Sequence, residues 1–223
     1  MKKLTRAILA TGLITAAATV PAYADVSGNV SLASDYIFRG VSQTGGDMAL
    51  QGGFDFEADN GFYAGVWGSN VTFADSLEVD FYAGFGGELG NNVGYDIGVI
   101  AYEYPSVDDL DFTEIYGSLS YVNFTAGLAY ADDLGGYESL YTSLAYDMEL
   151  ANEFGLSIFG GITTYDEDFW GTEDSYTDYG VALSKSWSGI DFSLTLTDTD
   201  LDDNDCGGSD CDATVTFSMS KSL

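Results

Sequence analysis

The sequence contains no histidine, only two cysteines and two prolines, and six basic residues against 36 acidic ones. Without histidine, a serine or aspartate lacks its usual partner as general base, so we predict no enzymatic activity and no cofactor. The chain also lacks the clustered Lys and Arg that phosphate binding requires, which excludes nucleic acid as a natural partner. No apolar run after the N-terminal segment reaches the about 20 residues of a transmembrane helix.

The first 24 residues have the features of a secretory signal peptide. Lys2, Lys3 and Arg6 precede an apolar, alanine-rich run, and Ala22-Tyr23-Ala24 fits the small-x-small cleavage rule. The run is too short for a membrane anchor. Cleavage after Ala24 would leave a single domain, residues 25–223, in which three bases face 36 acids, a formal charge of −33.

The two cysteines lie close together, as Cys206 and Cys211 in the stretch CGGSDC. An exported chain meets oxidising conditions, so we predict a local disulfide between them. A metal site is the alternative, but two thiols without histidine make a poor zinc site, and we assign no metal.

From Val26 onward, apolar and polar residues alternate with a period of two, the pattern of a β-strand with two different faces. Leu77, Val79 and Phe81, for example, alternate with Glu78 and Asp80. Twelve such segments occur, near residues 26–39, 48–58, 62–70, 77–88, 93–104, 112–120, 123–131, 139–148, 154–165, 176–186, 190–197 and 213–222. Many have the about ten residues that a tilted strand needs to cross an outer membrane. In the third segment, the apolar face is either Phe62, Ala64 and Val66 or Tyr63, Trp67 and Val71.

The connections between these segments alternate in length. Short turns fall at 59–61, 90–92, around 121–122, 149–153 and 187–189, and longer acidic loops at 40–47, 71–76, 105–111, 132–138, 166–175 and 198–211. Short turns at one end and long loops at the other are typical of outer-membrane barrels, and a soluble β-sandwich, the alternative fold, gives no reason for them.

We therefore predict an all-β fold, an antiparallel transmembrane β-barrel of twelve strands in a Gram-negative outer membrane. Its apolar side chains would contact membrane lipid, and both termini would lie in the periplasm. Ten or fourteen strands remain compatible with the pattern.

The stretch from Ser34 to Val71 resembles the opening of the TorF-type family of proteobacterial outer-membrane porins. The matching residues are Ser34, Tyr36, Phe38-Arg39-Gly40, Ser42-Gln43-Thr44, Gln51-Gly52 and the run GFYAGVWGSNV. The resemblance implies an export signal, a barrel and a channel. It implies no particular substrate and assigns no functional residues.

The polar parity of the strands predicts which side chains line the lumen. The candidates for lumen lining and selectivity are Asp35, Arg39, Asp55, Glu57, Glu78, Asp80, Tyr82, Asp96 and Glu114. An acidic lumen concentrates cations and repels anions. We therefore expect passive diffusion of small solutes or ions, with cations preferred. The alternative is a structural or surface-binding barrel whose lumen is plugged by side chains.

Arg39 is one of only three bases after residue 24. We expect it in the lumen near the outer mouth, paired with one or more strand carboxylates, of which Asp55 and Glu57 on the neighbouring segment are candidates. A guanidinium has five donors and can bridge several carboxylates. Two roles remain open: a structural pin that offsets repulsion among the acids, and a constriction residue that gates or selects.

The last loop is densely acidic and includes Asp198, Asp200, Asp202 and Asp205. Such carboxylates could bind calcium. The register does not fit an EF-hand, because Asp205 stands where glycine is needed when the loop is counted from Asp200. The alternative is a solvated acidic loop at the cell surface.

Overall fold

The computed structural model describes residues 7–10, 13–16, 25–73, 76–90, 92–171, 173–202, 205–206 and 208–223. Two short strands, β1 (Ala7–Ala10) and β2 (Leu13–Ala16), pair with each other within the predicted signal peptide. The predicted cleavage site after Ala24 lies outside the described residues. Among the described residues, no helix is long and apolar enough to cross a membrane.

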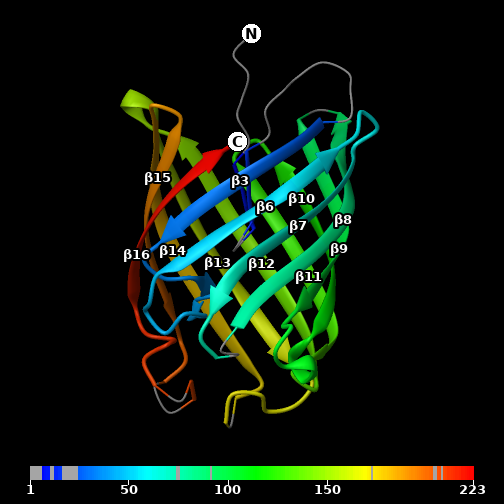
Figure 1. Ribbon diagram of the computed structural model, residues 1–223, viewed down its shortest axis with the longest axis vertical. Coiled ribbons are helices and arrows are strands. Elements are labelled where there is room, and N and C mark those ends of the chain that lie inside the picture. The colour runs from blue at the N-terminus through cyan, green and yellow to red at the C-terminus, as the bar shows by residue number, and fades with distance from the viewer. Residues whose placement is uncertain are drawn as a thin grey trace.

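Twelve strands form one closed antiparallel barrel, which confirms the predicted fold class and strand number (Figure 1). The strands are β3 (Asp25–Ala33), β6 (Ala49–Glu57), β7 (Phe62–Val71), β8 (Ser76–Gly90), β9 (Val93–Glu103), β10 (Phe112–Tyr121), β11 (Phe124–Leu134), β12 (Tyr137–Glu149), β13 (Phe154–Tyr165), β14 (Ser175–Trp187), β15 (Ile190–Thr199) and β16 (Thr214–Ser222). The last strand pairs with the first, from Ser218 opposite Ala33 to Ser222 opposite Asn29. This pairing leaves the sheet without an edge.

The outer surface of the barrel is apolar. Leu77 and Phe81 on β8, and Leu144 on β12, each expose more than half of their surface. In a protein surrounded by water, a continuous apolar surface of this kind would be a liability, whereas in lipid it is the favourable contact. On β7, Trp67 and Val71 are buried inside the barrel, so the outward face of this strand is the one with Phe62, Ala64 and Val66.

The two ends of the barrel differ. The start of β3 and the C-terminus lie at the end where the connections are short, which we call the short-turn end, and the opposite end is the long-loop end (Figure 1). Two connections contain a short 3₁₀ helix, η1 (Asp108–Leu110) at the long-loop end and η2 (Ala151–Glu153) at the short-turn end. One expected long loop is wrong: β11 and β12 extend into residues 132–138, ending at Leu134 and beginning at Tyr137, and are joined by Gly135 and Gly136 alone, both with positive φ.

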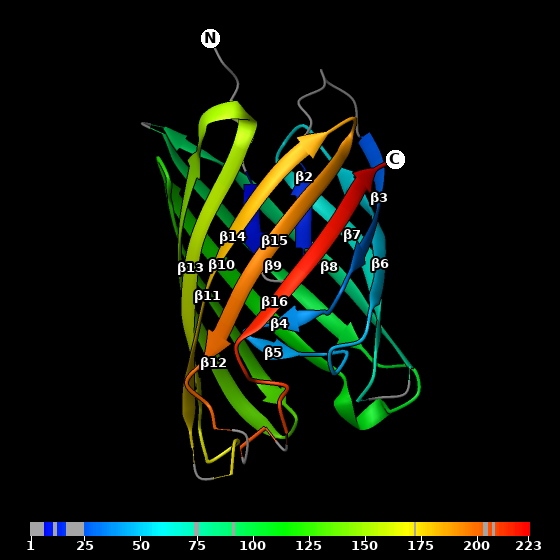
Figure 2. The same ribbon diagram turned by 90° about the vertical axis from the view of Figure 1, so that its left-hand side faces the viewer.

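The first segment also differs from the prediction. We expected one strand over residues 26–39, but β3 ends at Ala33. The chain then turns inward and forms a small hairpin of β4 (Ile37–Phe38) and β5 (Val41–Ser42) before it re-enters the wall at β6. Figure 2 shows this hairpin within the outline of the barrel, toward the long-loop end. Asp35 and Arg39 therefore lie on the hairpin segment and not on a wall strand.

Candidate constriction in the barrel lumen

The β4–β5 hairpin turns at Arg39 and Gly40. Ile37 pairs with Ser42, and Phe38 with Val41, so the two residues between them form the whole turn. Arg39 has φ 48° and Gly40 has φ 84°. Two consecutive positive φ values are those of a type I′ turn, the tight turn that suits the twist of a hairpin. Glycine adopts this conformation freely, whereas arginine seldom does.

A polar cluster holds the base of the hairpin. The Asp35 carboxylate accepts hydrogen bonds from the Ser42 hydroxyl at 2.6 Å and from the Thr44 hydroxyl at 2.7 Å. Thr44 is completely buried, and its hydroxyl oxygen also accepts from the Tyr36 N–H at 3.1 Å. Asp35, a predicted lumen residue, therefore has its carboxylate directed at the hairpin itself. Sequence reasoning missed Thr44 in this role.

The hairpin reaches across the lumen. On one side, the Tyr36 ring packs edge-on against Trp67 of β7, and its hydroxyl donates to Glu78 of β8 at 2.7 Å. On the other side, Gly40 lies against β14 and β15: a Cβ added there would come within 2.9 Å of the Asp178 Cβ and 2.4 Å of the Thr199 Cγ2. The hairpin thus contacts strands on both sides of the closed ring and narrows the bore at this level.

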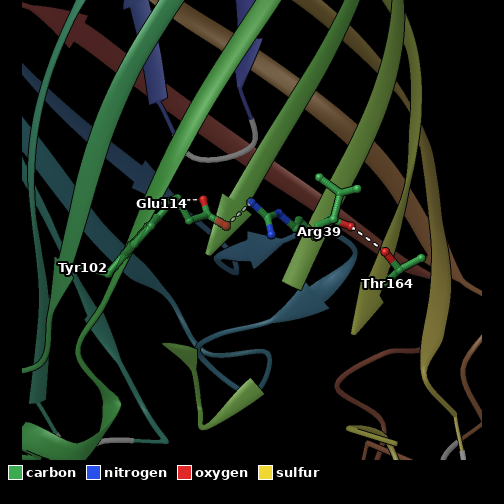
Figure 3. Close-up of polar contacts among 5 residues, drawn as sticks. Arg39, Tyr102, Glu114 and Thr164 are labelled. Carbon is green, nitrogen blue, oxygen red and sulfur yellow. Dashed lines mark hydrogen bonds and ion pairs between the residues drawn. The ribbon is translucent and has the colours of Figure 1, made fainter. Parts of the chain in front are cut away.

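Arg39 is buried at the centre of this constriction, with 4% of its surface exposed. Its Nη2 donates to Glu114 Oε1 of β10 at 2.6 Å, an ion pair, and Tyr102 donates to the other oxygen of Glu114 at 3.1 Å (Figure 3). The guanidinium also lies over the rings of Phe38 and Tyr141, at 4.7 and 4.3 Å from the ring centres. Its Nε and Nη1 have no hydrogen-bond partner.

Arg39 pairs with a strand carboxylate, as expected, but the two candidates named for it are wrong. Asp55 accepts hydrogen bonds from Tyr82 and, at 3.3 Å, from Asn29, and Glu57 is exposed at the end of β6. The error follows from the first strand: neighbours of a wall strand were expected as partners, whereas the hairpin carries Arg39 across the lumen to β10.

Tyrosine hydroxyls meet most of the other inward carboxylates. Besides Asp55 with Tyr82, the pairs are Glu78 with Tyr36 and Tyr104, Asp96 with Tyr63, and Asp178 with Tyr141. Tyr104 follows β9 in the loop, and its burial, together with the nearby Glu78, raises the pKa of this phenol well above its usual value. Each tyrosine can donate one hydrogen bond to a carboxylate and leave further acceptor sites open.

Asp80 completes the set of predicted lumen residues. It is 3% exposed, and its Oδ1 has no hydrogen-bond partner. Glu78, Asp80, Glu114 and Asp178 are therefore four buried acids on the wall strands around the constriction, in addition to the buried Asp35 at the base of the hairpin, and Arg39 is the base that lies among them. Of the other bases after residue 24, Lys185 is half-buried and Lys221 is exposed.

The acidic last loop is tied to the hairpin. Cys206 and Cys211 form a disulfide, and the Ser42 N–H donates to the Asp210 carbonyl at 2.7 Å. Three acids of the calcium hypothesis, Asp198, Asp200 and Asp205, accept backbone hydrogen bonds at 2.6 to 3.1 Å, and Asp202 is exposed. In the described part of the chain, which omits residues 203, 204 and 207, no group of three His, Cys, Asp or Glu could hold a metal ion.

A closed antiparallel barrel with an apolar outer surface and a polar lumen defines an outer-membrane β-barrel protein, and this chain is one. It belongs to the Gcw_chp family, described as bacterial proteins of unknown function, whose profile matches residues 16–223.

Solved porins share the fold. The NanC porin superposes with a TM-score of 0.57 at 11% identity, over 88% of this chain and 98% of that one. The KdgM porin superposes with a TM-score of 0.55 at 8% identity, over 88% and 98% of the two chains. No curated protein matches the chain in sequence.

Proposed function

We propose that this protein is an outer-membrane channel for the passive diffusion of small cations and small neutral solutes, narrowed by the β4–β5 hairpin. The observation that carries the proposal is the set of buried carboxylates around the constriction, Glu78, Asp80, Glu114 and Asp178, against the single buried guanidinium of Arg39. Rings of carboxylates select for cations, because the low-dielectric wall focuses their field into the bore.

Two further features support the proposal. The porin fold of the NanC and KdgM structures provides the scaffold, and the likeness of residues 34–71 to TorF-type porins points to the same class. In this proposal, the short-turn end and both termini face the periplasm, the long loops face the outside, and Arg39 is both a pin for the hairpin and a wall of the narrowest part. Residues 1–24 would be removed on export.

Planar-bilayer recording tests the channel. The purified chain is inserted into a bilayer between two KCl solutions of different concentration, and the reversal potential is measured. We expect a steady current and a reversal potential of the sign that K⁺ permeation gives. A reversal potential of the opposite sign would contradict the cation preference, and the absence of current would contradict the channel.

A plugged, non-transporting barrel is the second candidate function, and the contacts of Gly40 on the far wall favour it. The two candidates differ in one variant. The Gln43 N–H donates to the Tyr36 carbonyl at 2.7 Å, so the two residues are close enough to be joined by a two-residue turn. In the variant, residues 37–42 are replaced by Asn-Gly, a pair that forms a type I′ turn. A plug predicts current only in the shortened variant. A narrowed channel predicts current in both, with the larger conductance in the variant.

A further inference from the structure

A cavity of about 310 Å³ lies beside the hairpin at the long-loop end. Phe38 and Arg39 line it from the hairpin, and loops and strand ends from around the barrel form its other walls. We propose that this cavity, the vestibule, binds a small organic cation with an aromatic or alkyl body. The inference rests on the proposed function and names a class of solute for the mouth of the same channel. Binding in the vestibule can be measured whether or not the channel conducts.

Aromatic rings form the first wall of the vestibule. Tyr165 and Phe169 stack with their centres 4.3 Å apart and their planes 7° apart, and Trp170 meets Phe169 edge-on at 5.1 Å. Trp170 in turn meets Tyr176 edge-on at 6.0 Å. These rings come from the end of β13, the following loop and the start of β14. Each ring is fixed by its neighbours, so the wall is preformed.

A second aromatic wall stands on other strands. Tyr102 of β9 and Phe112 of β10 stack at 4.3 Å, and Phe38 of the hairpin packs edge-on against Tyr102 at 6.0 Å. Phe73 and Tyr104 meet at 5.4 Å in the adjoining loops. Cavities of this size and lining are typical of sites for small organic molecules. The rings favour a ligand with an apolar body, and the charges around the rings indicate the sign of the ligand's charge.

The vestibule is acidic in spite of Arg39. The guanidinium is 4% exposed, its charge is met by Glu114 at 2.6 Å, and the rings of Phe38 and Tyr141 cover it. Its charge is therefore balanced within the wall by Glu114, although its Nε and Nη1 have no partner. Glu78 lines the cavity and Asp210 stands exposed at its rim. The loop segments 105–111, 166–175 and 198–212 contain many acids and no base.

An organic cation satisfies both features. The faces of Trp, Tyr and Phe rings are electron-rich and attract an ammonium group, and they attract it most strongly where water is excluded. The acids add a field that concentrates cations at the mouth. An inorganic cation would gain little from the rings, and an anion of the same shape would be repelled.

Titration calorimetry with three one-ring probes tests the inference: benzyltrimethylammonium, benzyl alcohol and phenylacetate. Each is added to the detergent-solubilised chain. We expect the cation to bind about tenfold or more tightly than the neutral and anionic probes. Equal binding of benzyl alcohol, equal or tighter binding of phenylacetate, or no binding of the cation would each overturn the inference.

Variants place the binding in the vestibule. Trp170→Leu opens the aromatic wall, and Trp187→Leu is the matched control, since Trp187 is exposed at the end of β14. We expect weaker cation binding in Trp170→Leu alone. Equal effects of the two substitutions would overturn the assignment. Asp210→Asn removes a rim charge without changing the wall, and we expect it to weaken the binding of the cation and not that of benzyl alcohol.

The failure of this inference and that of the proposed channel are distinguishable. A chain that passes K⁺ but does not bind benzyltrimethylammonium overturns the vestibule site alone. A chain that binds the probe but carries no current overturns the channel alone. Heat-dependent migration on a detergent gel, in which a folded barrel migrates differently before and after boiling, establishes that each variant is folded before it is titrated.

Discussion

Arg39 combines two features that are separately unfavourable. Its backbone has φ 48°, and its charge is 4% exposed. A non-glycine residue in the left-handed region and a charge removed from water each cost free energy, and both persist only where the surroundings compensate. Here the compensation comes from Glu114 and from the rings of Phe38 and Tyr141. We therefore expect the stability of the hairpin to depend strongly on Glu114.

The Glu114→Gln variant measures this dependence. It leaves the guanidinium buried without its counter-charge, and we expect the free energy of unfolding to fall by about 3–5 kcal/mol. The measurement is reversible urea unfolding of the chain in detergent or lipid. Glu149→Gln, at the exposed end of β12, is the control and should change little. A loss below about 1 kcal/mol, as for an exposed pair, would show that the ion pair contributes little.

Gly40 tests the contact of the hairpin with the far wall. In Gly40→Ala, the new Cβ would come within 2.4 Å of the Thr199 Cγ2, so the hairpin tip must move away from β15. We expect a larger single-channel conductance, recorded in planar bilayers. Gly46→Ala is a matched control in the same segment: Gly46 also has a positive φ, 79°, but nothing lies within 4 Å of its Cβ position. An equal effect of both substitutions would attribute the change to backbone strain alone.

At the scale of elements, the β4–β5 hairpin is too small to be stable by itself, because each strand has two residues and an isolated hairpin is at best marginal in water. Its position therefore depends on the segments that hold it. Gln43 accepts a hydrogen bond from the Thr72 N–H of the β7–β8 loop at 3.0 Å, and Ser42 donates to Asp210 of the β15–β16 loop at 2.7 Å.

The disulfide orders the second of these anchors. Cys211 is 1% exposed and packs with Val41 of the hairpin and with Leu201. We expect the Cys206→Ser/Cys211→Ser variant to lose about 2 kcal/mol of local stability in the β15–β16 loop, which is the loop-closure entropy that a disulfide across so short a loop removes from the unfolded chain. The barrel itself should stay folded. Limited proteolysis should cleave this loop faster than in the parent chain, with heat-dependent gel migration unchanged. Equal cleavage rates would contradict the anchoring role.

The hairpin is also the element that sequence reasoning missed. Alternation of apolar and polar residues predicts a β-strand whose two faces lie in different surroundings. This sufficed for the wall strands, since each has lipid on one side. Val30, Leu32, Tyr36 and Phe38 keep the same parity through Ala33, so the alternation did not reveal where the strand ends. The local signal was Arg39-Gly40, a dipeptide ending in glycine between the apolar residues Phe38 and Val41. The partner of Arg39, Glu114, is set by how far the hairpin extends across the lumen, and no local sequence pattern predicts that distance.

At the scale of the whole molecule, the barrel is held in place by its apolar belt. The belt consists of the apolar side chains that the wall strands expose on the outside of the barrel. Each strand crosses the belt, so the depth of a residue in the membrane follows from its position along the strand. On β14, Val181 lies near the middle with 37% of its surface exposed, and Trp187 ends the strand with 68% exposed. Lys185, between them in sequence, is half-buried and donates to the Asn152 carbonyl at 3.1 Å. This contact marks where the apolar surface gives way to polar surroundings.

Arginine substitutions along β14 test this depth. We expect Val181→Arg to lower the free energy of unfolding in lipid by about 2–4 kcal/mol, because a charge at the midplane of the bilayer loses its hydration, and Trp187→Arg by about 0–1 kcal/mol at the interface. Unfolding by urea in lipid vesicles measures both. The same pair in detergent micelles is the control, since a micelle deforms around a charge more easily than a bilayer. If the two substitutions cost the same in lipid, Val181 would not face the hydrocarbon core, and the barrel would have to sit at another depth or tilt than the one its belt indicates.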